Sequence, residues 1–279
     1  MRTQFKLTLT LLIVIYISSC KSISPPIAAN AEARTSIEML TTKGSIIIEL
    51  YNETPLHRDN FIKLVQERTY DSLLFHRVIG QFMIQAGDPD SKFAKPEDTI
   101  GFGGLDYKID AEFRPNLFHK KGVLAAARDG NLKRASSAIQ FYIVQGKVLN
   151  DSLIDRNERR INESLARHYA RNDPNNKSLL DAIQKARDDQ DRQRFIQLND
   201  SLNFIARAYS NFDYYVIPDA HRKVYKTIGG TPHLDQNYTV FGEVVQGIDH
   251  VDAIAAVPTG VFNRPIEDVR IIEMRILKN

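Results

Sequence analysis

The chain has 279 residues, of which 43% are hydrophobic and 25% are charged, so its composition is that of an ordinary globular protein. This length allows one large domain or two small ones. The net charge of +3 is small and no basic face is evident, which argues against a nucleic-acid-binding protein. The 7 histidines are scattered and form no ligand pair at helical spacing, which argues against a metal hydrolase.

Residues 1–20 predict an export signal. Arg2 and Lys6 precede the uncharged run LTLTLLIVIYIS, which is too short to favour a transmembrane helix. Cys20, the only cysteine, ends the sequence ISSC and resembles the lipobox cysteine of bacterial lipoproteins, which carries lipid and becomes the N-terminus. The alternatives are an ordinary signal peptide and an uncleaved anchor. Residues 21–35 have the composition of a flexible tether. No aspartate follows Cys20, which favours the outer membrane over the inner one.

The globular part is predicted to begin near Ser36. The β-rich runs IEMLTT and SIIIELY, separated by KG, predict a hairpin. A helix is predicted from Pro55 to about Glu67, with Thr54 as its N-cap. Its apolar face comprises Leu56, Phe61, Leu64 and Val65.

Further strands are predicted in the runs LLFHRVI, FMIQAGD, GVLAAAR, QFYIVQG, TVFGEVV and VRIIEMRIL. A short helix at residues 247–256 is expected between the last two runs. Many short strands with only two helices predict a mainly β protein that closes into a barrel.

The segment at about 148–227 interrupts this pattern, because it is densely charged with both signs and has helical periodicity. Ile154, Ile161 and Leu165 share one face, and the sequence NDPNN at 172–176 breaks the run. A second apolar stripe comprises Phe195, Leu198, Leu202, Ile205 and Tyr209. We predict an inserted antiparallel α-helical hairpin, whose stripe serves either packing between its own helices or the binding of a partner. A further short helix is predicted to start at Pro218.

Several separate motifs point to one family. Four segments resemble, in this order, the motifs of the cyclophilin-type peptidyl-prolyl cis-trans isomerases: FHRVIGQFMIQAGD, GVLAAAR, QFYI and HLDQNYTVFGEV. The resemblance covers residues 37–146 and 229–278. It implies a closed eight-stranded antiparallel barrel capped by two helices over residues 36–279, interrupted by the insertion. It also implies an enzyme that needs no cofactor and no metal and binds proline-containing unfolded or extended polypeptides.

The chemistry of such an enzyme explains why the first motif holds no nucleophile. Rotation about a peptide bond has a barrier of about 18–20 kcal/mol because resonance gives the C–N bond double-bond character. At X–Pro both isomers are accessible, and no bond needs to break. An apolar pocket for the ring, a donor near the amide and anchors for the chain are sufficient to favour the twisted amide.

The resemblance assigns a catalytic set of Arg77, Phe82 and Gln85. Arg77 matches the arginine that donates to the prolyl carbonyl and stabilises the pyramidal nitrogen. Phe82 matches part of the pocket that takes the proline ring, and Gln85 matches a residue that bonds the substrate backbone. The matches to substrate-binding positions are Met83, Ala127, Arg128, Gln140, Tyr142, His233, Leu234 and Tyr238. At positions 127 and 128 the backbone is expected to pair with the substrate.

Three of these residues differ from common family members. Tyr142 replaces a phenylalanine and adds a hydroxyl group. His233 stands where many eukaryotic members have the tryptophan that favours cyclosporin, which makes tight binding of this drug doubtful. Tyr238 stands where many members have a histidine. The insertion is the largest departure, and we expect it to overhang the groove.

The sequence therefore predicts a peptidyl-prolyl isomerase that faces the periplasm of a bacterial cell envelope, anchored by lipid at Cys20. The alternative is a proline-segment binding module or chaperone with little catalysis. The matched Arg77, Phe82, Met83 and Gln85 favour the enzyme.

Overall fold

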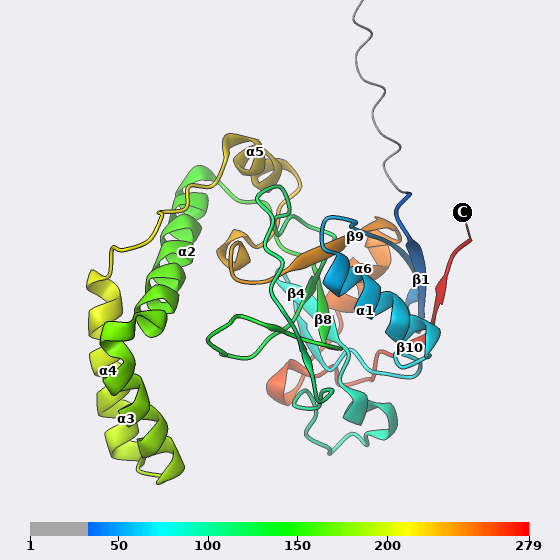
Figure 1. Ribbon diagram of the computed structural model, residues 1–279. Coiled ribbons are helices and arrows are strands. Elements are labelled where there is room, and N and C mark those ends of the chain that lie inside the picture. Colours follow the sequence, from blue (N-terminus) through cyan, green and yellow to red (C-terminus); the bar gives the residue numbers. More distant parts are fainter. Residues whose placement is uncertain (1–32, 279) are drawn as a thin grey trace, which may run out of the picture. The chain divides into compact units, whose positions relative to one another are not determined.

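The computed structural model describes residues 33–278, so the predicted signal, most of the tether and Cys20 lie outside the described residues. Eight strands form one antiparallel sheet (Figure 1). In spatial order they are β10 (Ile271–Ile276), β1 (Ser36–Thr41), β2 (Gly44–Leu50), β9 (Val240–Gln246), β6 (Val123–Ala126), β8 (Phe141–Val144), β4 (Met83–Ala86) and β3 (Arg77–Ile79). A separate pair joins β5 (Lys108–Ile109) to β7 (Ser136–Ser137).

The prediction of a closed barrel is wrong, because the sheet is a half-barrel that stays open between its edge strands β3 and β10. The residues just before these strands do meet. The amide of Phe75 donates to Val269 at 2.9 Å and the amide of Ile271 donates to Leu73 at 2.8 Å. The contact there is an isolated bridge between Leu74 and Arg270 and not a strand ladder. Strand β3 is 3 residues long and pairs with β4 alone.

The strands of the pocket side are buried on both faces. Along β8, Phe141 and Ile143 point into the main core, whereas Tyr142 and Val144 join a second apolar cluster on the opposite face. This alternation follows from the two-residue period of a strand. The main core is completed by α1 (Pro55–Gln66) and α6 (Ile248–Ala255), which are the two helices expected from the sequence.

Helix α1 begins where the sequence predicts, but Thr54 does not cap it with its side chain. The carboxylate of Glu112 accepts hydrogen bonds from the amides of Leu56 at 3.2 Å and His57 at 3.0 Å. Glu112 also accepts a bond from His57 Nδ1 at 2.8 Å. A carboxylate at this end satisfies unpaired amides and favours the helix dipole.

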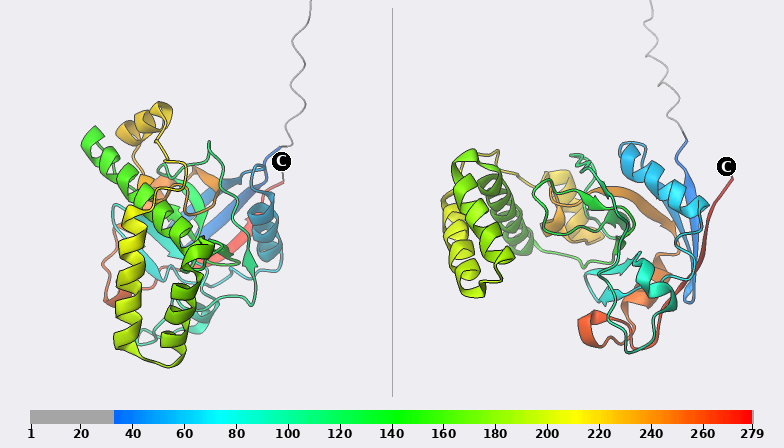
Figure 2. Two further views of the ribbon diagram at one scale, coloured as in Figure 1. Left: turned by 60° about the vertical axis from the view of Figure 1, so that its left-hand side comes forward. Right: turned by 60° about the horizontal axis from the view of Figure 1, so that its bottom comes forward.

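The insertion is more than a two-helix hairpin, because its first arm is broken. It contains α2 (Asp151–Asn172), α3 (Lys177–Asp188), α4 (Arg192–Ala208) and α5 (Asp219–Thr227). The break between α2 and α3 coincides with the predicted NDPNN sequence and holds a 3-10 turn, η2 (Pro174–Asn176). Helix α4 runs back along both α2 and α3 (Figure 2). Other 3-10 turns are η1 (Pro89–Phe93), η3 (Pro232–Leu234) and η4 (Val261–Asn263).

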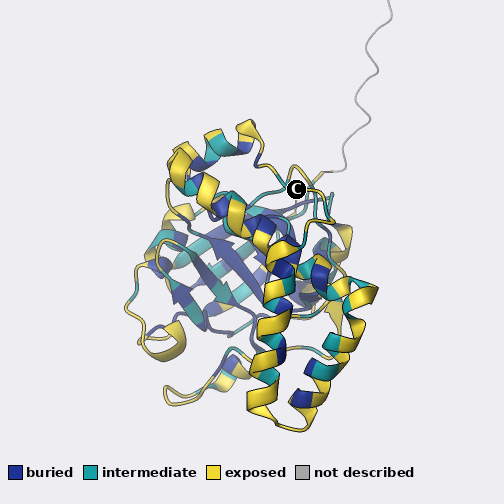
Figure 3. Ribbon diagram, turned by 90° about the vertical axis from the view of Figure 1, so that its left-hand side faces the viewer, coloured by how far each residue is buried: buried dark blue, intermediate teal, exposed yellow. Residues whose placement is uncertain are grey.

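The insertion packs around two apolar clusters of its own. Leu198 and Leu202 of α4 pack against Ile183 and Ala186 of α3, so this part of the second stripe packs between the insertion's own helices. A second cluster joins α2 to Tyr225 of α5 and includes Phe118 from the sheet domain. Figure 3 shows α2 with buried residues along its length and with the sheet behind it.

The two ends of the insertion meet. The amide of Gly230 donates to the carbonyl of Lys147 at 3.1 Å, and the amide of Lys121 donates to Gly229 at 3.1 Å. A long insertion whose ends lie together disturbs its host little. Within residues 33–278, no helix is long and apolar enough to cross a membrane.

Candidate active site

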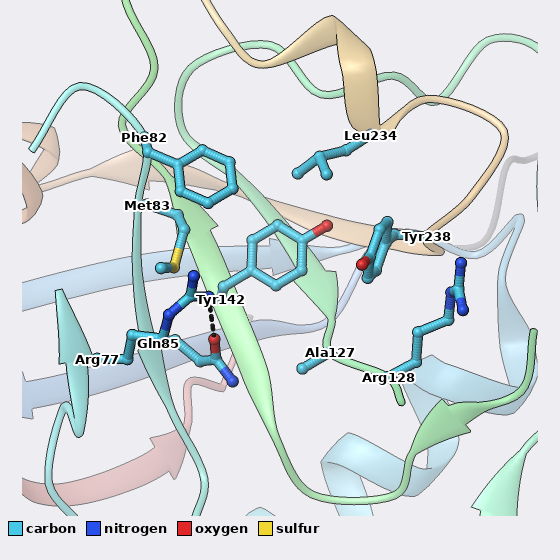
Figure 4. Close-up of a pocket in the computed structure, with 9 residues that line it drawn as sticks. All are labelled: Arg77, Phe82, Met83, Gln85, Ala127, Arg128, Tyr142, Leu234 and Tyr238. Carbon is cyan, nitrogen blue, oxygen red and sulfur yellow. Dashed lines mark hydrogen bonds between the residues drawn. The ribbon is translucent and has the colours of Figure 1, made fainter. Parts of the chain in front are cut away.

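A pocket of about 160 Å³ lies over the face of β4 and β8 that carries the second apolar cluster (Figure 4). Strand register brings its polar residues together, because Arg77 lies opposite Gln85 and Gln85 lies opposite Tyr142. Opposite residues of paired strands point to the same face. The pocket is lined by Arg77, Phe82, Met83, Gln85, Ala127, Arg128, Tyr142, Leu234 and Tyr238.

A tight turn between β3 and β4 places Phe82 at the pocket. Gln81 adopts a left-handed conformation with φ of 60°, and the amide of Phe82 donates to Ile79 at 3.1 Å. The carbonyl of Phe82 accepts the amides of Gln145 and Gly146, at 3.1 and 3.0 Å. The ring is therefore held between the hairpin and the chain that leads into the insertion.

His233 lies behind this wall. Its ring stacks on Phe82 with centroids 5.5 Å apart and an angle of 26° between the rings. The pKa of His233 is lowered to about 4, and burial is the main cause. His233 is therefore uncharged at neutral pH and contributes a flat neutral ring, as the tryptophan of other family members does.

Arg77 is held by a chain of amide groups. Its Nη1 donates to Gln85 Oε1 at 3.3 Å, and Gln85 Nε2 donates to Gln140 Oε1 at 2.9 Å. Gln140 Nε2 donates in turn to the carbonyls of Gly103 at 2.7 Å and Gly101 at 3.2 Å. Among residues 33–278 Gln85 is the one hydrogen-bond acceptor of the Arg77 side chain, so the other donors of this guanidinium remain available to a ligand.

The opposite rim is built by Arg128 and Tyr238. The guanidinium of Arg128 lies 4.7 Å from the centre of the Tyr238 ring, and Arg128 Nε donates to the carbonyl of Asn237 at 2.7 Å. The Arg128 side chain thus shapes the pocket, whereas the resemblance implied a role only for the backbone at this position. The amide and carbonyl of Ala127 are bonded to Gln140 and Ser137. Both backbone groups of Ala127 are therefore already paired within the protein.

Every predicted site residue within the described chain lies in or beside this pocket. Gln140 and His233 do not line it but contact Gln85 and Phe82, which do. The sequence missed three residues behind the pocket, namely His119, Asp235 and Tyr225, which connect to the hydroxyl of Tyr142. Within residues 33–278 no group of histidine, cysteine and acidic residues is arranged to hold a metal ion.

Comparison with known proteins identifies this arrangement. A family model described as cyclophilin type peptidyl-prolyl cis-trans isomerase/CLD matches residues 36–194 and 179–276. The chain belongs to this family of isomerases. Curated relatives of this cyclophilin include a protein of Staphylococcus haemolyticus that is provisionally named a peptidyl-prolyl cis-trans isomerase. It is 27% identical over 234 residues, which cover 84% of this chain and 86% of the relative. A Staphylococcus aureus relative with the same name is 27% identical over 239 residues, covering 85% and 89% of the two chains.

Solved structures agree with the fold of this cyclophilin. A cyclophilin-type isomerase of Cryptosporidium parvum matches with a TM-score of 0.52 and 18% identity, covering 88% of this chain and 99% of the other. The same protein crystallised in the presence of the dipeptide Ala-Pro matches with a TM-score of 0.51 and 18% identity. The half-barrel of this chain is therefore the cyclophilin fold.

Proposed function

We propose that this cyclophilin accelerates X–Pro isomerisation in exported proteins, with Arg77 as the group that stabilises the twisted amide. The observation that carries the proposal is a small pocket with apolar walls, into which the guanidinium of Arg77 is held by Gln85. A volume of about 160 Å³ suits one small ring, because drug-sized ligands occupy roughly 300–1,000 Å³.

The residues of the pocket have different roles in the proposed reaction. Phe82, Met83 and Leu234 offer apolar surface to a proline ring, and Tyr142 adds an aromatic face. Arg77 donates toward the prolyl carbonyl and nitrogen, and Gln85 keeps the guanidinium in place. These donors favour the twisted amide over the planar one, which lowers the rotation barrier without a covalent intermediate.

The test is a kinetic assay on a short X–Pro peptide with the chain from Lys21 onward. We expect Arg77→Ala to lower kcat/KM at least about tenfold, which is a loss of about 1.4 kcal/mol of transition-state stabilisation. Peptide affinity should fall less than turnover, because the apolar pocket remains. Arg275→Ala is the matched control, since Arg275 is exposed on β10 and pairs with Glu38.

The assay also separates the alternative function. A wild-type rate near the uncatalysed one, together with suppression of client aggregation, would favour a proline-segment binding module or chaperone. Unchanged kcat/KM in Arg77→Ala would remove this residue from the mechanism.

We further propose that the protein is held at the bacterial envelope by lipid at Cys20 and faces the periplasm, preferably at the outer membrane. The proposal rests on the charged start, the apolar run and the single cysteine of residues 1–20. A clickable fatty acid should label wild-type cells and not Cys20→Ser. The wild-type protein should resist salt washing and yield to detergent, because several acyl chains anchor stably. An unlabelled, freely released wild type would favour a simple secretory signal.

A further inference from the structure

The hydroxyl group that distinguishes Tyr142 from a phenylalanine is bound behind the pocket. Tyr142 Oη lies 2.9 Å from His119 Nε2, and His119 Nδ1 lies 2.8 Å from Asp235 Oδ1. The amide of His119 also donates to Asp235 Oδ1, at 2.9 Å. These residues expose 4%, 1% and 1% of their surfaces, so water does not compete for these bonds.

The fourth member of this network comes from the insertion. Tyr225, on α5, donates its hydroxyl to Asp235 Oδ2 at 2.7 Å and is fully buried. Its ring is fixed in place by Gly230, where an added Cβ would lie 2.7 Å from Tyr225 Cε1. The pocket residue Tyr142 and the insertion residue Tyr225 thus share one carboxylate through His119.

With a neutral His119, one arrangement of protons satisfies every donor and acceptor of the network. An ionised Asp235 accepts from the His119 amide, from His119 Nδ1 and from Tyr225. His119 Nε2 then has a free lone pair and accepts from the Tyr142 hydroxyl. In this arrangement the hydroxyl hydrogen of Tyr142 points toward His119, and its ring faces the ligand side as a phenylalanine would.

Asp235 also lies next to a pocket wall in the chain. It directly follows Leu234, which lines the pocket, and precedes Tyr238 by three positions. Two connections thus join Tyr225 to the pocket, one through Asp235 and His119 to Tyr142 and one through Asp235 along the backbone to Leu234.

We propose that Tyr225 is a positioning residue for the prolyl pocket, so that the helical insertion sets the shape of the pocket through Asp235 and His119. This deepens the proposed isomerase function and rests on it for its kinetic test. The insertion is then a part of the binding site that is built outside the half-barrel.

The test compares Tyr225→Phe, Tyr142→Phe and the double variant on a short X–Pro peptide. Tyr225→Phe should raise KM about fivefold and change kcat little, because it displaces a wall and leaves Arg77 in place. The double variant should lose less than the product of the two single losses, since both changes act on one network. Tyr209→Phe is the matched control, because it removes a 3.0 Å bond to Asp173 elsewhere in the insertion.

A spectroscopic readout separates positioning from general stability. The imidazole ¹⁵N resonances of His119 should shift in Tyr225→Phe and stay in place in Tyr209→Phe. Should Tyr225→Phe not fold, 3-fluorotyrosine at position 225 keeps the shape, changes the acidity of the hydroxyl and should shift the same resonances.

Unshifted His119 resonances, an unchanged KM or fully multiplicative losses would each overturn the proposal. An inactive wild type would overturn the proposed function instead, and the His119 resonances would still decide whether the network couples Tyr225 to the pocket.

Discussion

Replacing Glu112 with glutamine should destabilise the protein measurably while leaving the pocket untouched. Both carboxylate oxygens of Glu112 accept bonds at the start of α1, from the amides of Leu56 and His57 and from His57 Nδ1. A glutamine keeps one acceptor and turns an NH₂ group toward the other donors. Glu112 is 5% exposed, so water cannot replace the lost acceptor.

The magnitude follows from these contacts. A buried donor left without a partner costs about 1–3 kcal/mol, and the lost negative charge at the helix start adds about 0.3–1 kcal/mol. A total loss of about 2 kcal/mol in the free energy of unfolding lowers the Tm by about 4–8 °C in a domain of this size. Thermal unfolding followed by circular dichroism at neutral pH measures the difference, with Glu97→Gln, a change at an exposed residue, as the control.

The effect should depend on pH in a defined direction. Burial raises the pKa of Glu112, but the hydrogen bonds from His57 and Leu56 lower it by more, so the net pKa lies below the ordinary value of 4.5. A depressed carboxyl pKa stabilises the folded state above the unfolded pKa, and this contribution is lost as the pH falls through the folded value. The Tm gap between wild type and Glu112→Gln should therefore be full at neutral pH and narrow below about pH 4.5. A gap of equal size at every pH, or none at neutral pH, would refute this account of the helix cap.

Two further predictions concern the insertion. Gly230→Ala should destabilise the protein strongly, because the added Cβ would lie 2.3 Å from the carbonyl oxygen of His119. Gly104→Ala is the control, because nothing lies within 4 Å of a Cβ there. Chemical denaturation compares the two variants, and equal stabilities would contradict the steric argument. Replacing residues 177–208 with a short Gly/Ser linker should preserve the fold and keep kcat/KM on a short peptide within about twofold of wild type, because Tyr225 is retained. Removing residues 148–227 should lower kcat/KM more. Equal activity of the two deletions would show that the insertion does not support the pocket.

The pocket residues could be predicted from sequence because the motifs that carry them resemble those of the cyclophilin family, and strand register explains why several of them meet. Once Arg77, Met83 and Gln85 are placed on neighbouring strands, register alone brings them to one face. The four motifs also occur in the family's order, so the residues of distant loops such as Leu234 could be assigned without a structure.

The network behind the pocket could not be predicted in this way. His119 and Asp235 are 116 positions apart, and a single histidine or aspartate beside apolar residues has no local pattern that shows its partner. Tyr225 lies in a segment without a counterpart in the family motifs. The same limit explains the helix cap, where Thr54 has the expected residue type but Glu112, 56 positions from Leu56, makes the bonds.

The open side of the half-barrel has a consequence for a protein that meets extended chains. An uncovered edge strand is a template on which another polypeptide can add a strand. In β10, however, the carbonyl of Ile271 accepts the amide of Ser72 at 2.9 Å, and the amide of Met274 donates to Asp71 Oδ1 at 3.3 Å. At the other edge, β3 offers only 3 residues. An extended chain therefore finds few free backbone groups at these two edges of the described sheet, which disfavours strand addition there.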